Sequence, residues 1–305
     1  MEYRPGEAME PLRDCPFCPG HEEQTPPTLL ATGDASGWET RVFANRFPAL
    51  RVEAERGIVS TDLYGQADGL GAHEVMVESA RHEDEYATLS AERFFAILSG
   101  WQARVVDLSR DERLAYATIF KNAGAQSGAT LRHPHSQLIA TPIVPPAVLE
   151  RLDGAARFWR RTGRCVHCAV AEETERNGQR LVWADEEVMV FCPYAPRVAF
   201  ECVVLPRAHD SSFAAADASE LRAVGRGLQR LFTSLGQALP GVSYHMAIAS
   251  APLRSAPSAA EHWYVEVLPV LSRQAAFEMA SGMTIVSTPP ETAAAYLRAR
   301  IAEQP

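Results

Sequence analysis

Apolar residues recur along this chain with two different periods, one typical of helices and one typical of strands. Two segments carry an apolar residue at every third or fourth position, which predicts one long amphipathic helix in each half of the chain. Their apolar positions are Phe94, Leu98, Trp101, Val105 and Leu108 in the first segment, and Leu221, Val224, Leu228, Leu231 and Leu235 in the second. Asp217, with Glu220 three residues later, predicts an N-cap for the second helix. The stretches YATIFKNAG (116–124) and YHMAIASAP (244–252) predict strands.

The order of these segments repeats about halfway along the chain, which indicates an internal duplication. In each half a Cys-x-x-Cys pair comes first, and strand-like segments, a long helix and two further strands follow. VFANRFPAL (42–50) matches VFCPYAPRV (190–198), and HEVMVESARH (73–82) matches FECVVLPRAH (200–209). We therefore expect an N-terminal half over residues 1–146, a helical linker over 147–164 and a C-terminal half over 165–305.

Composition and charge exclude several classes of protein. Apolar residues make up 47% of the 305 residues and charged residues 22%, the balance of a globular protein with a buried core. The net charge of −9 argues against a nucleic-acid-binding surface. No stretch approaches the roughly 18 apolar residues of a membrane span, and the N-terminus lacks the apolar core of a signal peptide. We expect a soluble, cytoplasmic protein with neither nucleic acid nor membrane as a partner, and with reduced cysteines.

The spacing of cysteines and histidines predicts a metal site in each half. Each Cys-x-x-Cys pair is followed by two histidines at matching positions: Cys15, Cys18, His82 and His133 in the first half, and Cys165, Cys168, His209 and His262 in the second. Two thiolates and two imidazoles bind zinc tetrahedrally and leave no open position, so we predict two structural zinc ions per chain. A redox motif or a pair of buried thiols is the alternative. The other cysteines, Cys192 and Cys202, are predicted core residues, and His21, His73, His167 and His245 are predicted surface or core residues.

The end of the first half carries the candidate chemistry. Residues two apart in a strand share a face, so His133, His135 and Gln137 are expected on one side of the sheet. Upstream, residues 122–130 are small and flexible enough for backbone N–H groups to approach phosphate oxygens. Imidazole is a good nucleophile at neutral pH and can form a covalent phosphoryl intermediate. The second half has Tyr264 where His135 stands, so one active site is expected. A second metal site at His135, or a packed histidine, is the alternative.

The string NAGAQSGATLRHPHSQ (122–137), with Cys-Pro-Phe-Cys before it and FANRFPAL (43–50) between, resembles the galactose-1-phosphate uridylyltransferase family of the histidine-triad superfamily. The resemblance covers about residues 13–300. It implies an α+β fold, a duplicated histidine-triad-like fold with a mainly antiparallel sheet and helices packed outside. It also implies that His135 is the covalent nucleophile, that His133 is a zinc ligand, and that Gln137 orients the phosphoryl oxygen.

The same resemblance assigns the substrate contacts. It implies that Phe43 and Asn45 hold the nucleotide base and ribose and that Asn122 and Thr130 contact the phosphates. The loop amides near Ser127 and Gly128 are expected to stabilise charge on the phosphoryl oxygens. Glu278 is the acidic residue of the segment that resembles the sugar-binding tail. Ser136 and Thr284 depart from the family pattern, which has Gly and Gln there, and the tail FEMASGMTIVSTPPE (277–291) resembles the ADP-glucose phosphorylase-like branch.

We therefore expect a nucleotidylyltransferase that moves a nucleoside monophosphate from an NDP-sugar to a sugar 1-phosphate through a nucleotidyl-histidine. One alternative is an NDP-sugar phosphorylase that uses inorganic phosphate as the acceptor. A non-catalytic zinc- or nucleotide-binding protein is the other. A homodimer is expected. The sequence does not name the base or the sugar.

Overall fold

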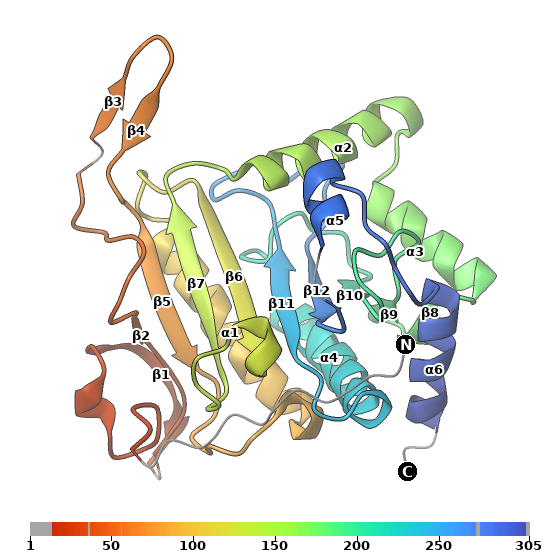
Figure 1. The fold of residues 1–305 in the computed structure, drawn as a ribbon, viewed down its shortest axis with the longest axis horizontal. Helices are drawn as coiled ribbons and strands as arrows, with labels where there is room; N and C mark the ends of the chain where they lie inside the picture. The colour runs from red at the N-terminus through yellow and green to blue at the C-terminus, as the bar shows by residue number, and fades with distance from the viewer. Residues whose placement is uncertain (1–13, 36, 56, 273–274, 303–305) are drawn as a thin grey trace.

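A single ten-stranded sheet runs through the molecule, and every neighbouring pair of its strands is antiparallel. The computed structural model describes residues 14–35, 37–55, 57–272 and 275–302, so the N-terminal residues behind the signal-peptide expectation lie outside it. In spatial order the strands are β1 (Thr28–Asp34), β2 (Gly37–Ala44), β5 (Ala72–Val77), β7 (His135–Thr141), β6 (Tyr116–Ala123), β11 (Tyr244–Ala249), β12 (Tyr264–Pro269), β10 (Cys202–Pro206), β9 (Val188–Phe191) and β8 (Leu181–Ala184) (Figure 1).

The strand order is symmetric about the central pair β6–β11. Strands of the first half lie on one side of this pair and strands of the second half on the other. The two central strands pair antiparallel from Tyr244 opposite Ala123 to Ile248 opposite Ile119. On either side follow β7 and β12, then β5 and β10, so each strand has a counterpart in the other half. The predicted duplicated α+β fold is confirmed.

Two long helices, α1 (Ala91–Leu108) and α4 (Ala218–Ala238), cover one face of the sheet, behind the strands in Figure 1. The apolar positions predicted for both helices are buried. The Asp217 side chain accepts a hydrogen bond from the Glu220 amide, as the capping pattern predicted. The helices also approach each other closely, because a Cβ at Gly225 would lie 2.9 Å from the Ala91 carbonyl oxygen. A third helix, α6 (Pro290–Ala302), packs on α4 and β8.

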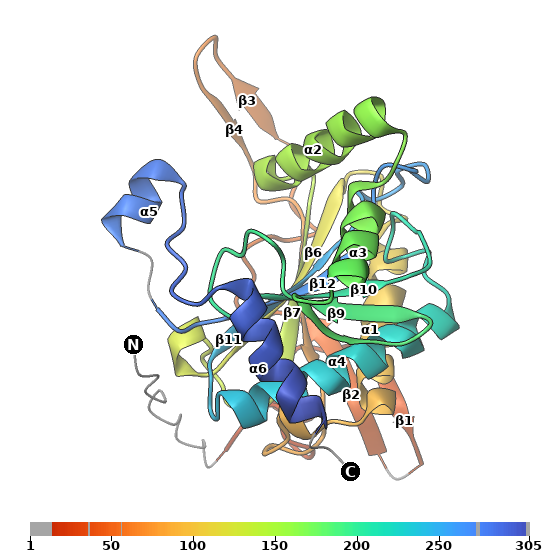
Figure 2. The same ribbon diagram turned by 90° about the vertical axis from the view of Figure 1, so that its right-hand side faces the viewer.

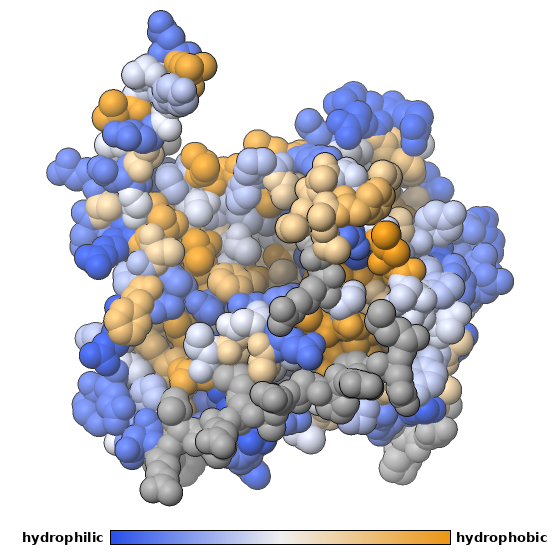
Figure 3. Space-filling model, in the orientation of Figure 1, coloured by the Kyte–Doolittle hydropathy of each residue, from blue (hydrophilic) through white to orange (hydrophobic). Residues whose placement is uncertain are grey.

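The opposite face is covered only in part. Figure 2 shows α2 (Pro146–Thr162), α3 (Val166–Asn177) and α5 (Ala276–Ser281) away from the α1–α4 layer. A hairpin of β3 (Ile58–Ser60) and β4 (Gly65–Ala67) projects from the first half (Figure 1). The space-filling view shows that the face of the sheet opposite α1 and α4 is hollowed between the first half and α5 (Figure 3). We call this face of the sheet the open face. Within the described ranges, no helix is long and apolar enough to cross a bilayer.

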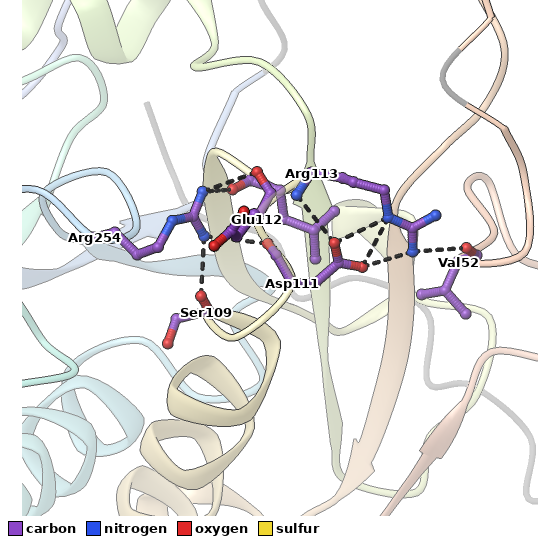
Figure 4. Close-up of polar contacts among 7 residues, drawn as sticks. Val52, Ser109, Asp111, Glu112, Arg113 and Arg254 are labelled. Atoms are coloured by element: carbon purple, nitrogen blue, oxygen red, sulfur yellow. Dashed lines mark hydrogen bonds and ion pairs between the residues drawn. The ribbon is translucent and has the colours of Figure 1, made fainter.

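An arginine of the second half makes a dense set of hydrogen bonds to the first half. Arg254, in the loop after β11, donates hydrogen bonds to four main-chain carbonyl oxygens of the turn between α1 and β6 (Figure 4): those of Ser109, Asp111, Glu112 and Leu114. Its φ of 59° lies in the left-handed region that non-glycine residues rarely adopt. The four bonds offset this backbone strain, because hydrogen bonds to a charged group are among the stronger ones.

Candidate active site and metal centres

His135 begins strand β7, and its imidazole is held in one tautomer. Its Nδ1 lies 2.9 Å from the main-chain oxygen of His133, and because a carbonyl can only accept, Nδ1 must donate. The lone pair is therefore on Nε2. Burial, and next the charge of Lys121, lower the pKa of His135, so the ring is neutral at pH 7. A neutral imidazole with a free Nε2 is the form that attacks as a nucleophile.

One phenylalanine contacts this imidazole and packs on a second one from β2. The Phe17 ring lies edge-on to the His135 ring, with 5.4 Å between centroids, and contacts Phe43 at 5.6 Å. Phe43 is only 2% exposed and belongs to the same apolar cluster as Val75 and Val77. Sequence reasoning missed Phe17, because between two cysteines it carries no periodic signal. The Phe17 ring, supported by Phe43, restricts water around the candidate nucleophile.

The departure at position 136 has a structural explanation. Ser136 points to the helix side of β7, where it is 1% exposed. Its hydroxyl accepts a hydrogen bond of 2.9 Å from the indole N–H of the buried Trp101. A glycine there would leave this N–H without its partner. Ser136 therefore satisfies the core behind the site and leaves the open face unchanged.

A buried ion pair stands behind His135, and sequence analysis did not predict it. The Lys121 ammonium donates to a Glu78 carboxylate oxygen at 2.5 Å and to the His135 main-chain oxygen at 2.9 Å. The Tyr86 hydroxyl donates to the other carboxylate oxygen of Glu78. The side chains of Lys121 and Glu78 are 4% and 0% exposed. Lys121 borders a cavity of about 290 Å³ between the sheet and α4.

The predicted phosphate loop follows β6, and its groups differ in what they offer a ligand. The Asn122 carboxamide oxygen accepts a hydrogen bond from Nδ1 of His245, on β11 of the second half. The amide N–H and the hydroxyl of Ser127 both donate to the Gly124 carbonyl oxygen. Gly128 has a left-handed φ of 80°. Thr130, the last of the predicted contacts, is exposed. Among these groups, the Asn122 carboxamide is the one whose orientation is fixed by a hydrogen bond from the other half of the molecule.

On the open face, the Asn45 carboxamide nitrogen lies 3.4 Å from the Gln137 side-chain oxygen. These two predicted residues are therefore brought together, next to His135. His73, predicted as a surface or core residue, lies between them.

The first predicted metal site is assembled in full. The Cys15, Cys18, His82 and His133 side chains form one group of potential ligands. The Cys15 and Cys18 sulfurs lie 3.7 and 3.6 Å from Nδ1 of His133, and Cys18 lies 3.4 Å from Nδ1 of His82. In a tetrahedral zinc site, sulfur and nitrogen ligands are about 3.6 Å apart. The four side chains therefore fit a zinc ion.

The surroundings of His133 support the same assignment. Its Nε2 lies 2.8 Å from the Ser79 main-chain oxygen and must donate there, which leaves Nδ1 for a metal. Burial lowers the pKa of His133 to about 4, so the ring is neutral, as a metal ligand must be.

The second predicted metal site is assembled in part. Cys165, Cys168 and His209 form one group, with 3.3 Å between the Cys168 sulfur and Nδ1 of His209. Nε2 of His209 faces the Ser258 main-chain oxygen, as Nε2 of His133 faces Ser79. The fourth predicted ligand, His262, lies outside this group. Its ring contacts that of His209 at 5.2 Å, and its Nδ1 donates to the Trp263 carbonyl oxygen.

Glu278 lies in α5, where its carboxylate accepts a hydrogen bond of 3.0 Å from the Ala275 amide. In this position it caps the first turn of its own helix. No described residue of the first half bonds to it, so a role toward a sugar stays a prediction.

Comparisons with known proteins identify the family of this chain. The model of the galactose-1-phosphate uridyl transferase N-terminal domain matches residues 3–145. The ADP-glucose phosphorylase of Arabidopsis thaliana is 30% identical over 290 residues, which covers 93% of this chain and 81% of that protein. The chain belongs to the galactose-1-phosphate uridylyltransferase family. It is therefore a nucleotidyltransferase.

Solved structures extend the likeness to the whole fold. A structure of the Arabidopsis thaliana ADP-glucose phosphorylase with bound ADP-glucose superposes with a TM-score of 0.83 at 28% identity, covering 93% of this chain and 88% of that one. A structure of a uridylyltransferase superposes with a TM-score of 0.85 at 26% identity, covering 98% and 94%. An ADP-glucose phosphorylase and a uridylyltransferase thus share the architecture of this chain.

Proposed function

We propose that this protein transfers a nucleoside monophosphate from an NDP-sugar to a phosphate-bearing acceptor through a covalent intermediate on His135. The observation that carries the proposal is the neutral imidazole of His135, with Nδ1 held by a carbonyl and Nε2 free on the open face. The carboxamides of Gln137 and Asn122 stand on the same face and supply hydrogen-bond donors for phosphoryl oxygens.

The transfer takes two steps at one nitrogen. In the first, the Nε2 lone pair attacks the α-phosphorus, and the bond from this phosphorus to the bridging oxygen breaks. Sugar 1-phosphate leaves with the bonding electrons. In the second, a phosphate oxygen of the acceptor attacks the same phosphorus, the P–N bond breaks, and neutral His135 is restored. Two half-reactions through one intermediate predict ping-pong kinetics.

The proposal has two forms, which differ in the acceptor of the nucleoside monophosphate. A sugar 1-phosphate acceptor makes the protein a hexose-1-phosphate uridylyltransferase, the main expectation from the sequence. Inorganic phosphate makes it an NDP-sugar phosphorylase. The 30% identity to an ADP-glucose phosphorylase across most of both chains favours this second candidate.

We also propose that zinc has a structural role in both halves of the molecule. In the first half it would be held by Cys15, Cys18, His82 and His133, and in the second by Cys165, Cys168 and His209, with His262 as the expected fourth ligand. Bound there, zinc supplies structural cross-links and no open coordination position. Phe43 and Asn45 are proposed to hold the base and ribose, and Glu278 the sugar. A homodimer and a cytoplasmic location stay predictions.

A labelling experiment tests the mechanism and the acceptor together. The zinc-loaded protein is incubated with ADP-glucose or UDP-glucose labelled in the α-phosphate, and protein-bound label is measured after denaturation. We expect an acid-labile label with the preferred nucleotide and none with His135→Ala. Chase with galactose 1-phosphate should release labelled NDP-sugar, and chase with inorganic phosphate should release labelled NDP. Whichever acceptor discharges the enzyme faster is the substrate. No label with any nucleotide, although transfer proceeds, would rule out the covalent mechanism.

A further inference from the structure

The side chain of His73 is fixed at both ring nitrogens. The Ala49 main-chain N–H donates to Nδ1 of His73 at 3.1 Å, so Nδ1 must be the accepting nitrogen. The hydrogen of this neutral ring is therefore on Nε2. Nε2 lies 2.8 Å from the Gln137 side-chain oxygen, and it donates there.

Asn45 holds the same oxygen from a second direction. Its own carboxamide oxygen accepts the Phe47 main-chain N–H at 2.9 Å, which turns its NH₂ group inward. That nitrogen lies 3.4 Å from the Gln137 oxygen. Its main-chain N–H also donates to the His73 carbonyl oxygen at 2.7 Å, which ties the loop to β5. Two N–H donors thus converge on one oxygen of Gln137.

A carboxamide whose oxygen is held in this way has only its NH₂ group left for a ligand. The Gln137 side-chain nitrogen bonds to none of the described residues, and Gln137 stands two residues from His135 on the same face. We propose that His73 is a positioning residue that, with Asn45, sets the Gln137 carboxamide so that its NH₂ group meets the phosphoryl oxygen at His135. This inference rests on the proposed function.

The second half of the molecule builds the same strands with other groups at these positions. By strand register, the positions that match Asn45, His73 and Gln137 are Pro193, Glu201 and Glu266. There Arg197 donates hydrogen bonds to both carboxylates. The equivalent strands β9, β10 and β12 therefore form without a contact between an imidazole and a carboxamide, so the sheet does not require His73 and Gln137 themselves.

A double-mutant cycle tests the proposal. Gln137→Ala should lower kcat by about a hundredfold, because it removes a transition-state donor. His73→Phe, which keeps a ring but removes the Nε2 donor, should lower kcat by about tenfold through misplacement of the Gln137 donor, with the KM for NDP-sugar nearly unchanged. In a Gln137→Ala background, His73→Phe should have no further effect on kcat. His73→Gln, which restores a donor, should recover part of the rate.

His245→Phe is the matched control, because His245 also holds a site carboxamide, that of Asn122, but not through Gln137. Its effect should be the same in the parent and in Gln137→Ala. Thermal midpoints and zinc content are measured for every variant. A full His73→Phe loss in the Gln137→Ala background, in a parent that forms the nucleotidyl intermediate, would overturn the positioning role. A parent that forms no intermediate would instead refute the proposed function.

Discussion

The two halves of this molecule share a scaffold and differ in the groups that can react. On the open face, β7 of the first half carries His135 and Gln137, and β12 of the second half carries Tyr264 and Glu266 at the matching positions. Both strands are flanked by a group of cysteine and histidine side chains that fits a metal. The groups of cysteine and histidine side chains are thus common to both halves, and the candidate imidazole nucleophile belongs to the first half alone.

The helix side of the sheet shows the same contrast. Cavities of about 290 and 270 Å³ occupy equivalent places in the two halves. The first is bordered by Lys121, paired with Glu78, and by strand register the positions that match this pair in the second half are Ile248 and Pro206. Since the second half forms the same strands with apolar residues there, the fold does not require a buried ion pair. The first half therefore has a buried ion pair next to its candidate active site, although burying the two charges costs desolvation free energy.

The largest expected effect comes from exchanging the groups that distinguish β7 from β12. His135→Ala should reduce transfer by at least about four orders of magnitude, since no other described imidazole stands at that position. Metal content and the thermal midpoint should stay at parental values. Tyr264→His should not create a second site, because Glu266 in place of Gln137 repels phosphoryl oxygens. Steady-state rates and protein-bound label check both variants, and near-normal transfer by His135→Ala would require direct displacement.

Loss of a metal ligand should also affect the two halves unequally. Cys15→Ser removes a ligand of the cluster that includes His133, and Cys165→Ser removes one from the second half. Structural zinc contributes about 10–16 kcal/mol in small zinc domains, so both variants should be less soluble. The Cys15→Ser protein that stays soluble should also lose transfer, because His133 and His135 share one strand end. Soluble Cys165→Ser should retain most of it. Zinc per chain and kcat of the soluble fractions are the measurements, and equal losses of kcat would contradict this view.

The sequence could predict the features that appear in it as a periodic or repeated pattern of residues. Both amphipathic helices, the duplication and the first metal site follow from apolar spacing and from cysteine pairs, which are local patterns. The position of His262 beside the second cluster, rather than in it, depends on its rotamer and its bond to Trp263, which no spacing encodes.

The features that the sequence could not predict are contacts between distant strands. His73 had no partner pattern, because its partners Ala49 and Gln137 come from a loop and from another strand. Lys121 is a single charge in an apolar stretch, and only the pairing of β6, β7 and β5 brings it to Glu78. In hindsight, a lone charge inside a predicted strand was the one signal for this pair.

The buried ion pair offers a smaller, graded test of the comparison. Glu78→Gln leaves the Lys121 ammonium buried without its counter-charge, which should lower the free energy of unfolding by about 3–5 kcal/mol. The double variant Glu78→Leu with Lys121→Ile replaces the ion pair by apolar side chains, as the second half does, and should recover much of this stability. Its kcat should remain below the parental value, because the His135 carbonyl has lost the Lys121 donor. Urea unfolding and kcat are measured together, and a double variant with parental kcat would reduce the pair to a structural role.

The smallest expected effect concerns the two loops that follow the central strands. In the repeat, the loop after β11 that carries Arg254 matches the phosphate loop after β6. The loop after β11 is held to the first half by the four hydrogen bonds that Arg254 donates to carbonyl oxygens (Figure 4). At the matching position, the loop after β6 makes one main-chain hydrogen bond to the second half, from the Gln126 amide to the Ser243 hydroxyl. The locked loop is expected to stabilise the molecule, and the other to serve the ligand.

Arg254→Ala should therefore lower the free energy of unfolding by about 1–2 kcal/mol and leave kcat and KM unchanged. Arg254→Gly removes the same four hydrogen bonds but relieves the backbone strain at the left-handed φ of 59°. Its loss of stability should be smaller than that of Arg254→Ala where this relief exceeds the entropy that glycine adds to the unfolded chain. Arg113→Ala, in the same turn, removes an exposed pair with Asp111 and serves as the control with a smaller loss. A fall in kcat for Arg254→Ala, at unchanged stability, would show that the loop after β11 also serves the reaction, and the functional contrast between the two halves would fail at this point.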